Sequence, residues 1–166
     1  MEELIMGRKK KVYTVAAIGL AIVLIFLESA LAYDKIFIVG NKTAVGLAKQ
    51  FFTTLNNESI PLEIVTSQFD KVKSEKYIFV LGGAKGPGSV EDFVNQVLTK
   101  EEQASANESG GRMFVKENVF APGQTIIVFT GPDEAAAADA RKNNRELWWE
   151  YLVEWFELDT SSPMAY

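Results

Sequence analysis

The stretch TIIVFTGPDEAAAADA, Thr125 to Ala140, carries a run of β-branched and aromatic residues into an alanine-rich segment through Gly131-Pro132-Asp133. Thr125–Phe129 is apolar on successive positions, a pattern that predicts a strand buried on both faces of a sheet. Asp133 stands where a helix N-cap is expected, and the alanines that come after it favour a helix. A strand, a glycine turn and a helix in this order predict one unit of an α/β fold.

Two earlier segments repeat this pattern. Lys35–Val39 is an apolar run, and after a glycine turn the helical spacing of Thr43–Phe52 follows it. Tyr77–Leu81 is the second apolar run, and Ser89, after a glycine-rich turn, is placed to cap a helix over Val90–Leu98. Strands that alternate with helices join through right-handed crossovers. The sequence therefore predicts a small, doubly wound, mostly parallel sheet with helices on both faces.

The remaining segments of this α/β domain, which we place at residues 34–158, are shorter or less regular. Leu62–Val65 is predicted to be a strand, Gln68–Lys76 a polar connection, and Met113–Val119 a strand or hairpin arm. Lys100–Gly111 is polar and has no apolar period, which predicts an exposed loop. The alanine-rich segment and the tryptophan-rich segment that ends at Leu158 are expected to form the longest helix, before a polar tail at residues 159–166.

Residues 1–33 have a different composition. Arg8–Lys11 is a basic cluster, and Val12–Leu27 comes next with sixteen residues that carry no charge. Extending the run to Tyr33 gives a helix of about 33 Å, enough to cross a hydrocarbon core of about 30 Å. We expect one hydrophobic helix over residues 12–33 that anchors the chain in the membrane.

The same N-terminus fits a cleaved signal peptide, because Ala30-Leu31-Ala32 has small residues where signal peptidase accepts them. We prefer the anchor, a single-pass protein of the cell membrane. Cleavage after Ala32, which would give a secreted or cell-surface protein, is the alternative. Both interpretations keep Arg8–Lys11 inside and place the domain from residue 34 onward outside the cell.

Composition excludes several classes of chemistry. The chain has no Cys and no His, which removes thiol nucleophiles, disulfides, the usual zinc ligands and imidazole bases. Its formal net charge is −5, and nucleic-acid binding requires clustered basic residues. We expect no nucleic-acid partner, no metal, no cofactor, no catalytic residue and a non-enzymatic role.

In open α/β sheets, ligands bind beside the carboxyl ends of the strands, where the glycine turns of this chain are predicted to lie. A sugar or an anion is the ligand expected at such an edge. The candidate residues are Gly40, Gly83, Gly86, Gly88, Ser89 and Gly131. The segment Gly82–Ser89 resembles a phosphate-binding loop but lacks the lysine of that motif. Asp133 is expected to cap its own helix, so we favour a structural role for these turns.

Three Asn-X-Ser/Thr sequons occur in predicted turns or loops and are candidate glycosylation sites, at Asn41, Asn57 and Asn107. Asn107 is the best candidate because it lies in the predicted loop. Asn41 is the worst because it lies in a tight turn between a strand and a helix.

The segment ELWWEYLVEWFEL, Glu146 to Leu158, carries a wide apolar stripe. Trp148, Leu152 and Phe156 have helical spacing and are expected to cover the sheet. Trp149 lies to one side of that stripe. Because tryptophan is favoured at protein interfaces and at membrane surfaces, Trp149 is predicted to contact a partner subunit or the outer leaflet.

Three stretches together resemble the α/β module of archaeal surface-layer proteins and their short surface-layer-like relatives. They are IVGN at residues 38–41, VLGGAKGPGSVEDFVNQVL at 80–98 and FAPGQTIIVFTGPDEAAAADAR at 120–141, within a likeness that covers Asp34–Arg145. The chain lacks the long β-rich lattice-forming region of that family. The resemblance implies an extracytoplasmic domain with a structural or assembly role, which contacts envelope proteins or itself. A binding module for a sugar or an anion at the glycine-turn edge is the alternative.

Overall fold

The structure is a computed structural model that describes residues 34–82, 89–108 and 110–159. The predicted N-terminal hydrophobic helix lies outside these residues, as does the predicted tail from residue 160 onward. Within the described ranges, no helix has the length and apolar character that a membrane crossing needs. Asp34 and the residues after it belong to one compact unit.

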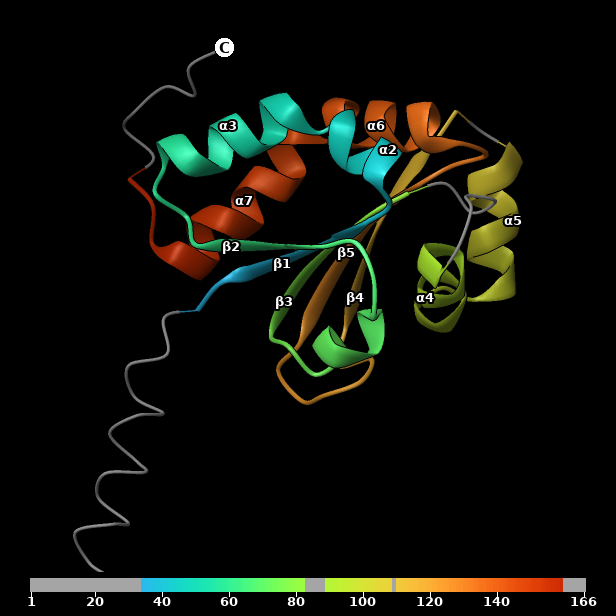
Figure 1. The fold of residues 1–166 in the computed structure, drawn as a ribbon, viewed down its shortest axis with the longest axis horizontal. Coiled ribbons are helices and arrows are strands. Elements are labelled where there is room, and N and C mark those ends of the chain that lie inside the picture. The colour runs from blue at the N-terminus through green and yellow to red at the C-terminus, as the bar shows by residue number, and fades with distance from the viewer. Residues whose placement is uncertain (1–33, 83–88, 109, 160–166) are drawn as a thin grey trace, which may run out of the picture. The chain divides into compact units, whose positions relative to one another are not determined.

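Five strands and six helices are described (Figure 1). The strands are β1 (Ile36–Gly40), β2 (Leu62–Val65), β3 (Tyr77–Leu81), β4 (Arg112–Glu117) and β5 (Thr125–Thr130). The helices are α2 (Lys42–Gly46), α3 (Lys49–Asn57), α4 (Ser89–Val97), α5 (Lys100–Glu108), α6 (Glu134–Asn143) and α7 (Arg145–Phe156), with a 3₁₀ turn η1 (Phe69–Val72).

The strands form one sheet in the order β2-β1-β3-β5-β4. β2, β1, β3 and β5 run parallel to one another, and β4 pairs antiparallel with β5 at the edge. Ile38 lies opposite Phe79, and Phe79 opposite Ile127, so the three central strands are in register. The chain winds from β1 outward to β2 and then back across β1 to β3 and β5. The predicted α/β fold with a mostly parallel sheet is confirmed.

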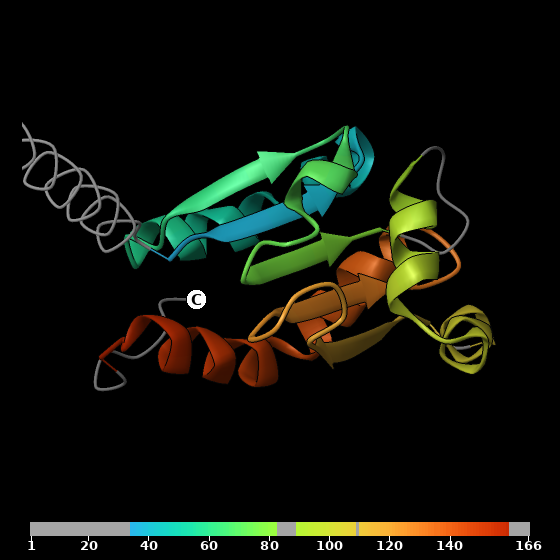
Figure 2. The same ribbon diagram turned by 90° about the horizontal axis from the view of Figure 1, so that it is seen from below.

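Two hydrophobic cores lie on the two faces of the sheet. Ile36, Ile38 and Phe79 point toward α2, α3 and α7, whereas Phe37 and Ile78 point toward η1 and α4. Figure 2 shows α4 and α5 near the end of the sheet to which the parallel strands run. Every residue of β1 and β3 is buried, as their uninterrupted apolar sequences predict.

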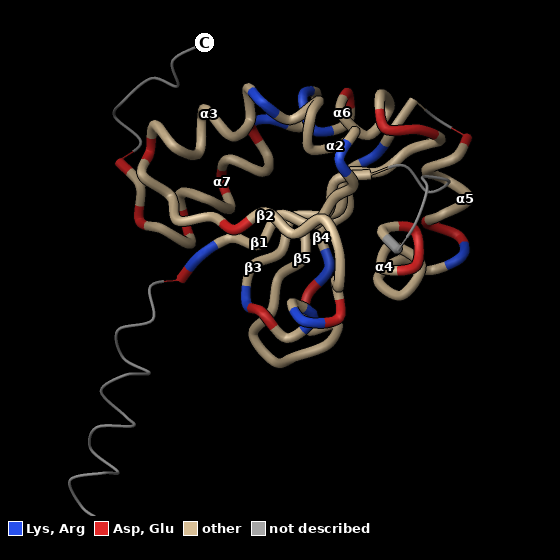
Figure 3. Tube along the Cα trace, in the orientation of Figure 1, with Lys and Arg blue, Asp and Glu red and all other residues tan. Residues whose placement is uncertain are grey.

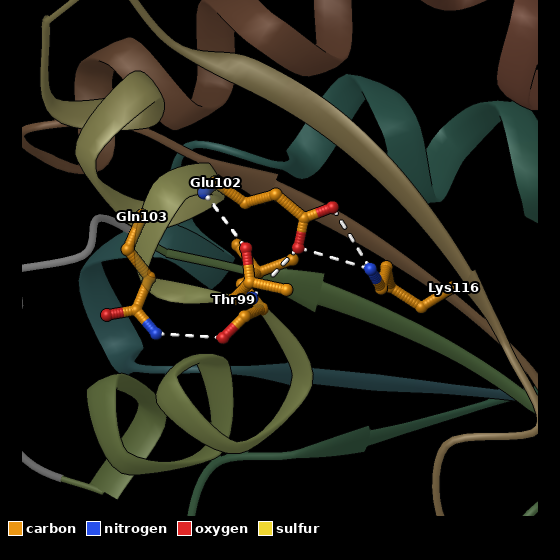
Figure 4. Close-up of polar contacts among 5 residues, drawn as sticks. Thr99, Glu102, Gln103 and Lys116 are labelled. Carbon is orange, nitrogen blue, oxygen red and sulfur yellow. Dashed lines mark hydrogen bonds and ion pairs between the residues drawn. The ribbon is translucent and has the colours of Figure 1, made fainter.

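The predicted loop at Lys100–Gly111 is wrong, because Lys100–Glu108 is the helix α5. A capping box starts this helix (Figure 4). The backbone N–H of Glu102 donates to Thr99 Oγ1 at 3.2 Å, and the Glu102 carboxylate accepts from the Thr99 N–H at 2.9 Å. Lys116 of β4 pairs with the same carboxylate at 3.0 Å. Polar contacts at its first turn therefore stabilise this helix, although its sequence lacks the apolar period by which helices are usually predicted.

The predicted long helix after β5 is two helices. Asn144 separates α6 from α7, and its side-chain amide donates to the Ala140 carbonyl at 2.7 Å. Because this bond caps the last turn of α6, the chain changes direction and α7 begins with its own axis. Thr43–Phe52 is likewise divided between α2 and α3. The polar connection Gln68–Lys76 contains η1, whose Phe69 is buried.

Candidate functional site

The predicted ligand edge includes Gly40, at the point where the winding of the sheet reverses. A Cβ placed on Gly40 would lie 3.0 Å from the Leu81 carbonyl oxygen, and one on Gly82 would lie 2.9 Å from Cγ1 of Val90. Both distances are too short for a side chain to be accepted without a shift of its neighbours. These glycines allow β1, β3 and α4 to approach each other closely.

Gly131 has a similar role at the end of β5. A Cβ at this position would lie 2.7 Å from the Ala136 Cβ and 3.0 Å from the Gly111 Cα. Gly111 has φ of +99°, and a Cβ there would overlap the Ala136 carbonyl oxygen. The pair lets α6 pack directly on the connection between α5 and β4. Gly111 was not singled out from the sequence, because it lay in the segment interpreted as a loop.

At this edge, side-chain oxygens of the protein accept hydrogen bonds from backbone N–H groups in the first turns of two helices. Asp133 Oδ1 accepts from the Ala136 N–H at 2.8 Å, which confirms the predicted cap of α6. Asn41 Oδ1 accepts from the Ala44 N–H at 2.8 Å, and its Nδ2 donates to Glu134 at 2.8 Å. One of the N–H groups that an anion would use at each of these two helix starts therefore already has an acceptor.

The rest of the predicted edge is described only in part. Gly83, Gly86 and Gly88 lie outside the described residues, and Ser89 is the first residue of α4. Thr130, just before Gly131, is fully buried, and its Oγ1 has no hydrogen-bond partner in the described part of the chain. Among the described residues, this hydroxyl is the one buried side-chain group at the edge that lacks a hydrogen-bond partner.

The described ranges contain no cluster of three carboxylates or other metal-binding side chains. A pocket of about 210 Å³ lies where η1 meets α4 and brings two carboxylates, Asp70 and Asp92, to its lining. Asp70 pairs with Lys73 at 2.5 Å.

A larger groove, of about 380 Å³, lies between α3 on one side and α6 and α7 on the other. Figure 3 shows Lys and Arg positions gathered where α3 approaches α6. The lining residues come from segments far apart in the sequence: Leu47, Gln50, Phe51, Thr54, Ala138, Asp139, Arg141, Lys142, Arg145 and Trp148. Its volume is within the range of small-molecule sites. The groove was not predicted from the sequence.

Arg141 is the buried charge of this groove. Only 8% of its surface is exposed, and its Nη2 donates to the Leu47 carbonyl at 2.9 Å. Its guanidinium carbon lies 5.5 Å from the centre of the Phe51 ring. Burial lowers the pKa of Arg141, but an arginine keeps its charge at neutral pH. None of the ion pairs among the described residues involves it.

The three sequons differ in accessibility. Asn57 is exposed at the last residue of α3. Asn107 lies inside α5, where its Nδ2 donates to the Gln103 carbonyl at 2.9 Å and its Oδ1 is buried. The Nδ2 of Asn41 is bound to Glu134. Asn57 is thus the most accessible of the three, and glycosylation at each remains a prediction.

Trp149 is half-buried and packs against the core beside Trp148, with ring centres 6.2 Å apart. Trp148 and Leu152 are buried, as the predicted stripe requires. The most exposed large hydrophobic side chain of α7 is Leu147, at 45%. The predicted contact of Trp149 with a partner remains a prediction. Part of the indole surface is exposed and could make such a contact.

No family model, no curated protein and no solved structure matches this chain. The resemblance to archaeal surface-layer proteins therefore rests on the sequence alone, and it remains a prediction.

Proposed function

We propose that this chain is a non-enzymatic protein of the cell envelope, whose α/β domain lies outside the cell near the membrane and makes structural or assembly contacts. The observation that carries the proposal is the basic cluster Arg8–Lys11 directly before the uncharged run Val12–Leu27. This order holds the basic cluster inside and exports the domain on the far side of the uncharged run. Residues 12–33 serve as the anchor, and cleavage after Ala32 is the alternative.

The geometry of the glycine turns supports a structural role for the domain. Neighbouring atoms fill the space beside Gly40, Gly82 and Gly131, and Asn41 and Asp133 cap their own helices. Each of these residues contributes to packing or capping. These contacts support a structural role for the turns, since they fill space and cap helix starts that a ligand would otherwise use.

The alternative function is an extracytoplasmic binding module that takes a sugar or an anion at the glycine-turn edge. The buried Thr130 hydroxyl, which has no partner among the described residues, favours it. Reproducible protection of this edge by a ligand would distinguish the module from the assembly protein.

Protease treatment of intact cells or spheroplasts tests the proposed topology. We expect the protease to digest the domain while the membrane is intact, and a membrane fraction to retain the chain. Complete protection under these conditions would show that the domain is inside. N-terminal sequencing of native material separates the two forms, because a mature N-terminus at Tyr33 would mean cleavage of a signal peptide.

A further inference from the structure

The groove between α3 and α6 contains a positive charge that the described residues leave incompletely paired. Arg141 can donate five hydrogen bonds, and the structure shows one, from Nη2 to the Leu47 carbonyl. Burying a charge without an opposite charge is costly, so buried arginines usually have a carboxylate partner. The Phe51 ring beside the guanidinium compensates for only part of that cost.

Arg141 is one of the residues that line the groove. The buried side-chain atoms without a hydrogen bond in the described ranges are Asn107 Oδ1 and Thr130 Oγ1, and no nitrogen of Arg141 is among them. Because a nitrogen enclosed without a partner would be among these atoms, the unbonded nitrogens of Arg141 keep some accessible surface. We infer that they are reached from the groove that Arg141 lines. The guanidinium is thus mostly buried beside the Phe51 ring and lines a groove from which its remaining N–H groups can be reached.

The composition of the wall decides which anion fits. Arg141, Lys142 and Arg145 outnumber Asp139, the one acidic lining residue, so the groove favours an anion. Leu47, half-exposed at 49%, offers an apolar surface at the rim. A planar carboxylate accepts the fork of an arginine. A carboxylate on a small apolar body therefore uses both the arginine fork and the apolar lining, whereas inorganic phosphate has no apolar part to place on Leu47.

We propose that the groove between α3 and α6–α7 is a binding site for a small organic carboxylate, with Arg141 as its anchor and Lys142 as a second cation at the rim. The apolar part of the ligand rests on Leu47. This site is separate from the glycine-turn edge. It requires no assumption about the compartment of the domain.

The test uses the full chain in non-ionic detergent and NMR titrations with three probes. Isovalerate is the carboxylate, isovaleramide is its uncharged counterpart of the same shape, and inorganic phosphate is the dianion. The reporter is the indole N–H of Trp148, which donates to the Arg141 carbonyl at 2.8 Å and lies in the lining of the groove. We expect isovalerate to shift this signal saturably, isovaleramide to leave it unchanged, and phosphate to bind more weakly than isovalerate.

Variants identify the anchor. Arg141→Gln should raise the Kd for isovalerate by roughly tenfold or more, the loss expected for a charge-assisted contact. Lys142→Gln, at an exposed position, should raise it by roughly threefold. Lys71→Gln in η1 removes the same charge at an exposed position that does not line the groove, and should leave the Kd unchanged.

Several results would overturn the proposal. Equal shifts with isovaleramide, tighter binding of phosphate, or unchanged affinity in a folded Arg141→Gln variant would each do so. If Arg141→Gln does not fold, Lys142→Glu is the test, because a reversed charge at the rim must weaken carboxylate binding. An unchanged Kd in this variant would contradict the site.

Discussion

At the scale of single residues, the cap of α6 gives the first prediction. Asp133 accepts from the Ala136 N–H, and loss of such a cap costs about 0.5–2 kcal/mol. We expect Asp133→Ala to lower the free energy of unfolding by this amount in denaturant titrations. Asp133→Asn retains an acceptor oxygen and should remain close to the wild type. Equal destabilisation by the two variants would mean that charge, and not capping, stabilises this helix start.

The second residue-scale prediction compares two glycines with positive φ. Gly123 has φ of +74° with open space around it, whereas a Cβ on Gly111 would overlap the Ala136 carbonyl. Gly123→Ala should cost only the backbone strain, about 1–2 kcal/mol. We expect Gly111→Ala to cost clearly more in the same unfolding measurement, because α6 must move. Similar losses would show that α6 is not packed closely on Gly111.

At the scale of the element, α5 gives a prediction about pH. Partial burial acts to raise the pKa of Glu102, but hydrogen bonds from the Thr99 N–H and Lys116 outweigh it, and the pKa is lowered. A carboxyl group with a lowered pKa stabilises the fold above its unfolded pKa, and this contribution is lost as the pH falls through its folded pKa. Glu102→Gln should therefore be less stable than the wild type at pH 7, by about 1 kcal/mol.

This difference should become smaller as the pH falls below about 4, where carboxyl groups protonate. Unfolding titrations at several pH values, together with hydrogen exchange of the α5 amides, measure it. A gap between wild type and Glu102→Gln that stays constant down to acid pH would contradict the role of the ionised carboxylate.

The elements also show what sequence patterns can and cannot predict. The strands β1, β3 and β5 could be predicted from their unbroken apolar runs, since only a sheet covered on both faces buries such residues. The helix α5 could not be predicted from hydrophobic periodicity, because its sequence has no apolar period. The capping-box spacing of Thr99 and Glu102 is the signal that indicates it. The break at Asn144 depends on a side-chain bond to Ala140, which no periodic pattern reveals.

At the scale of the whole molecule, the groove could not be predicted from the sequence. Arg141 meets the Leu47 carbonyl across 94 residues of sequence, and this contact exists only once α2, α3 and α6 share one face of the sheet (Figure 1). In an alanine-rich helix with several charged residues, the sequence predicts that an arginine side chain is exposed to solvent. Its burial results from its position next to Ala137 and Ala140, which face the core.

Assembly is also a property of the whole molecule. Substitutions of the two adjacent tryptophans of α7 can distinguish an effect on assembly from an effect on folding. Trp148 is 3% exposed, its ring meets Phe51 edge-on at 5.0 Å, and its indole donates to Arg141. Trp148→Ala should therefore cost about 3–5 kcal/mol of stability, as truncation of buried aromatic residues does. Trp149 is only half-buried. We expect Trp149→Ala to lower the melting temperature modestly and to weaken self-association by about 2 kcal/mol, the effect of an interface anchor.

Thermal melts and sedimentation of the full chain in detergent, with chemical cross-linking in native membranes, measure the two effects side by side. Trp148→Ala serves as the control for folding, since it should reduce the melting temperature far more than Trp149→Ala does. A large fall in melting temperature for Trp149→Ala with unaltered oligomers would place this side chain in the core. The surface for assembly would then have to lie elsewhere, because α7 would be committed to its own sheet.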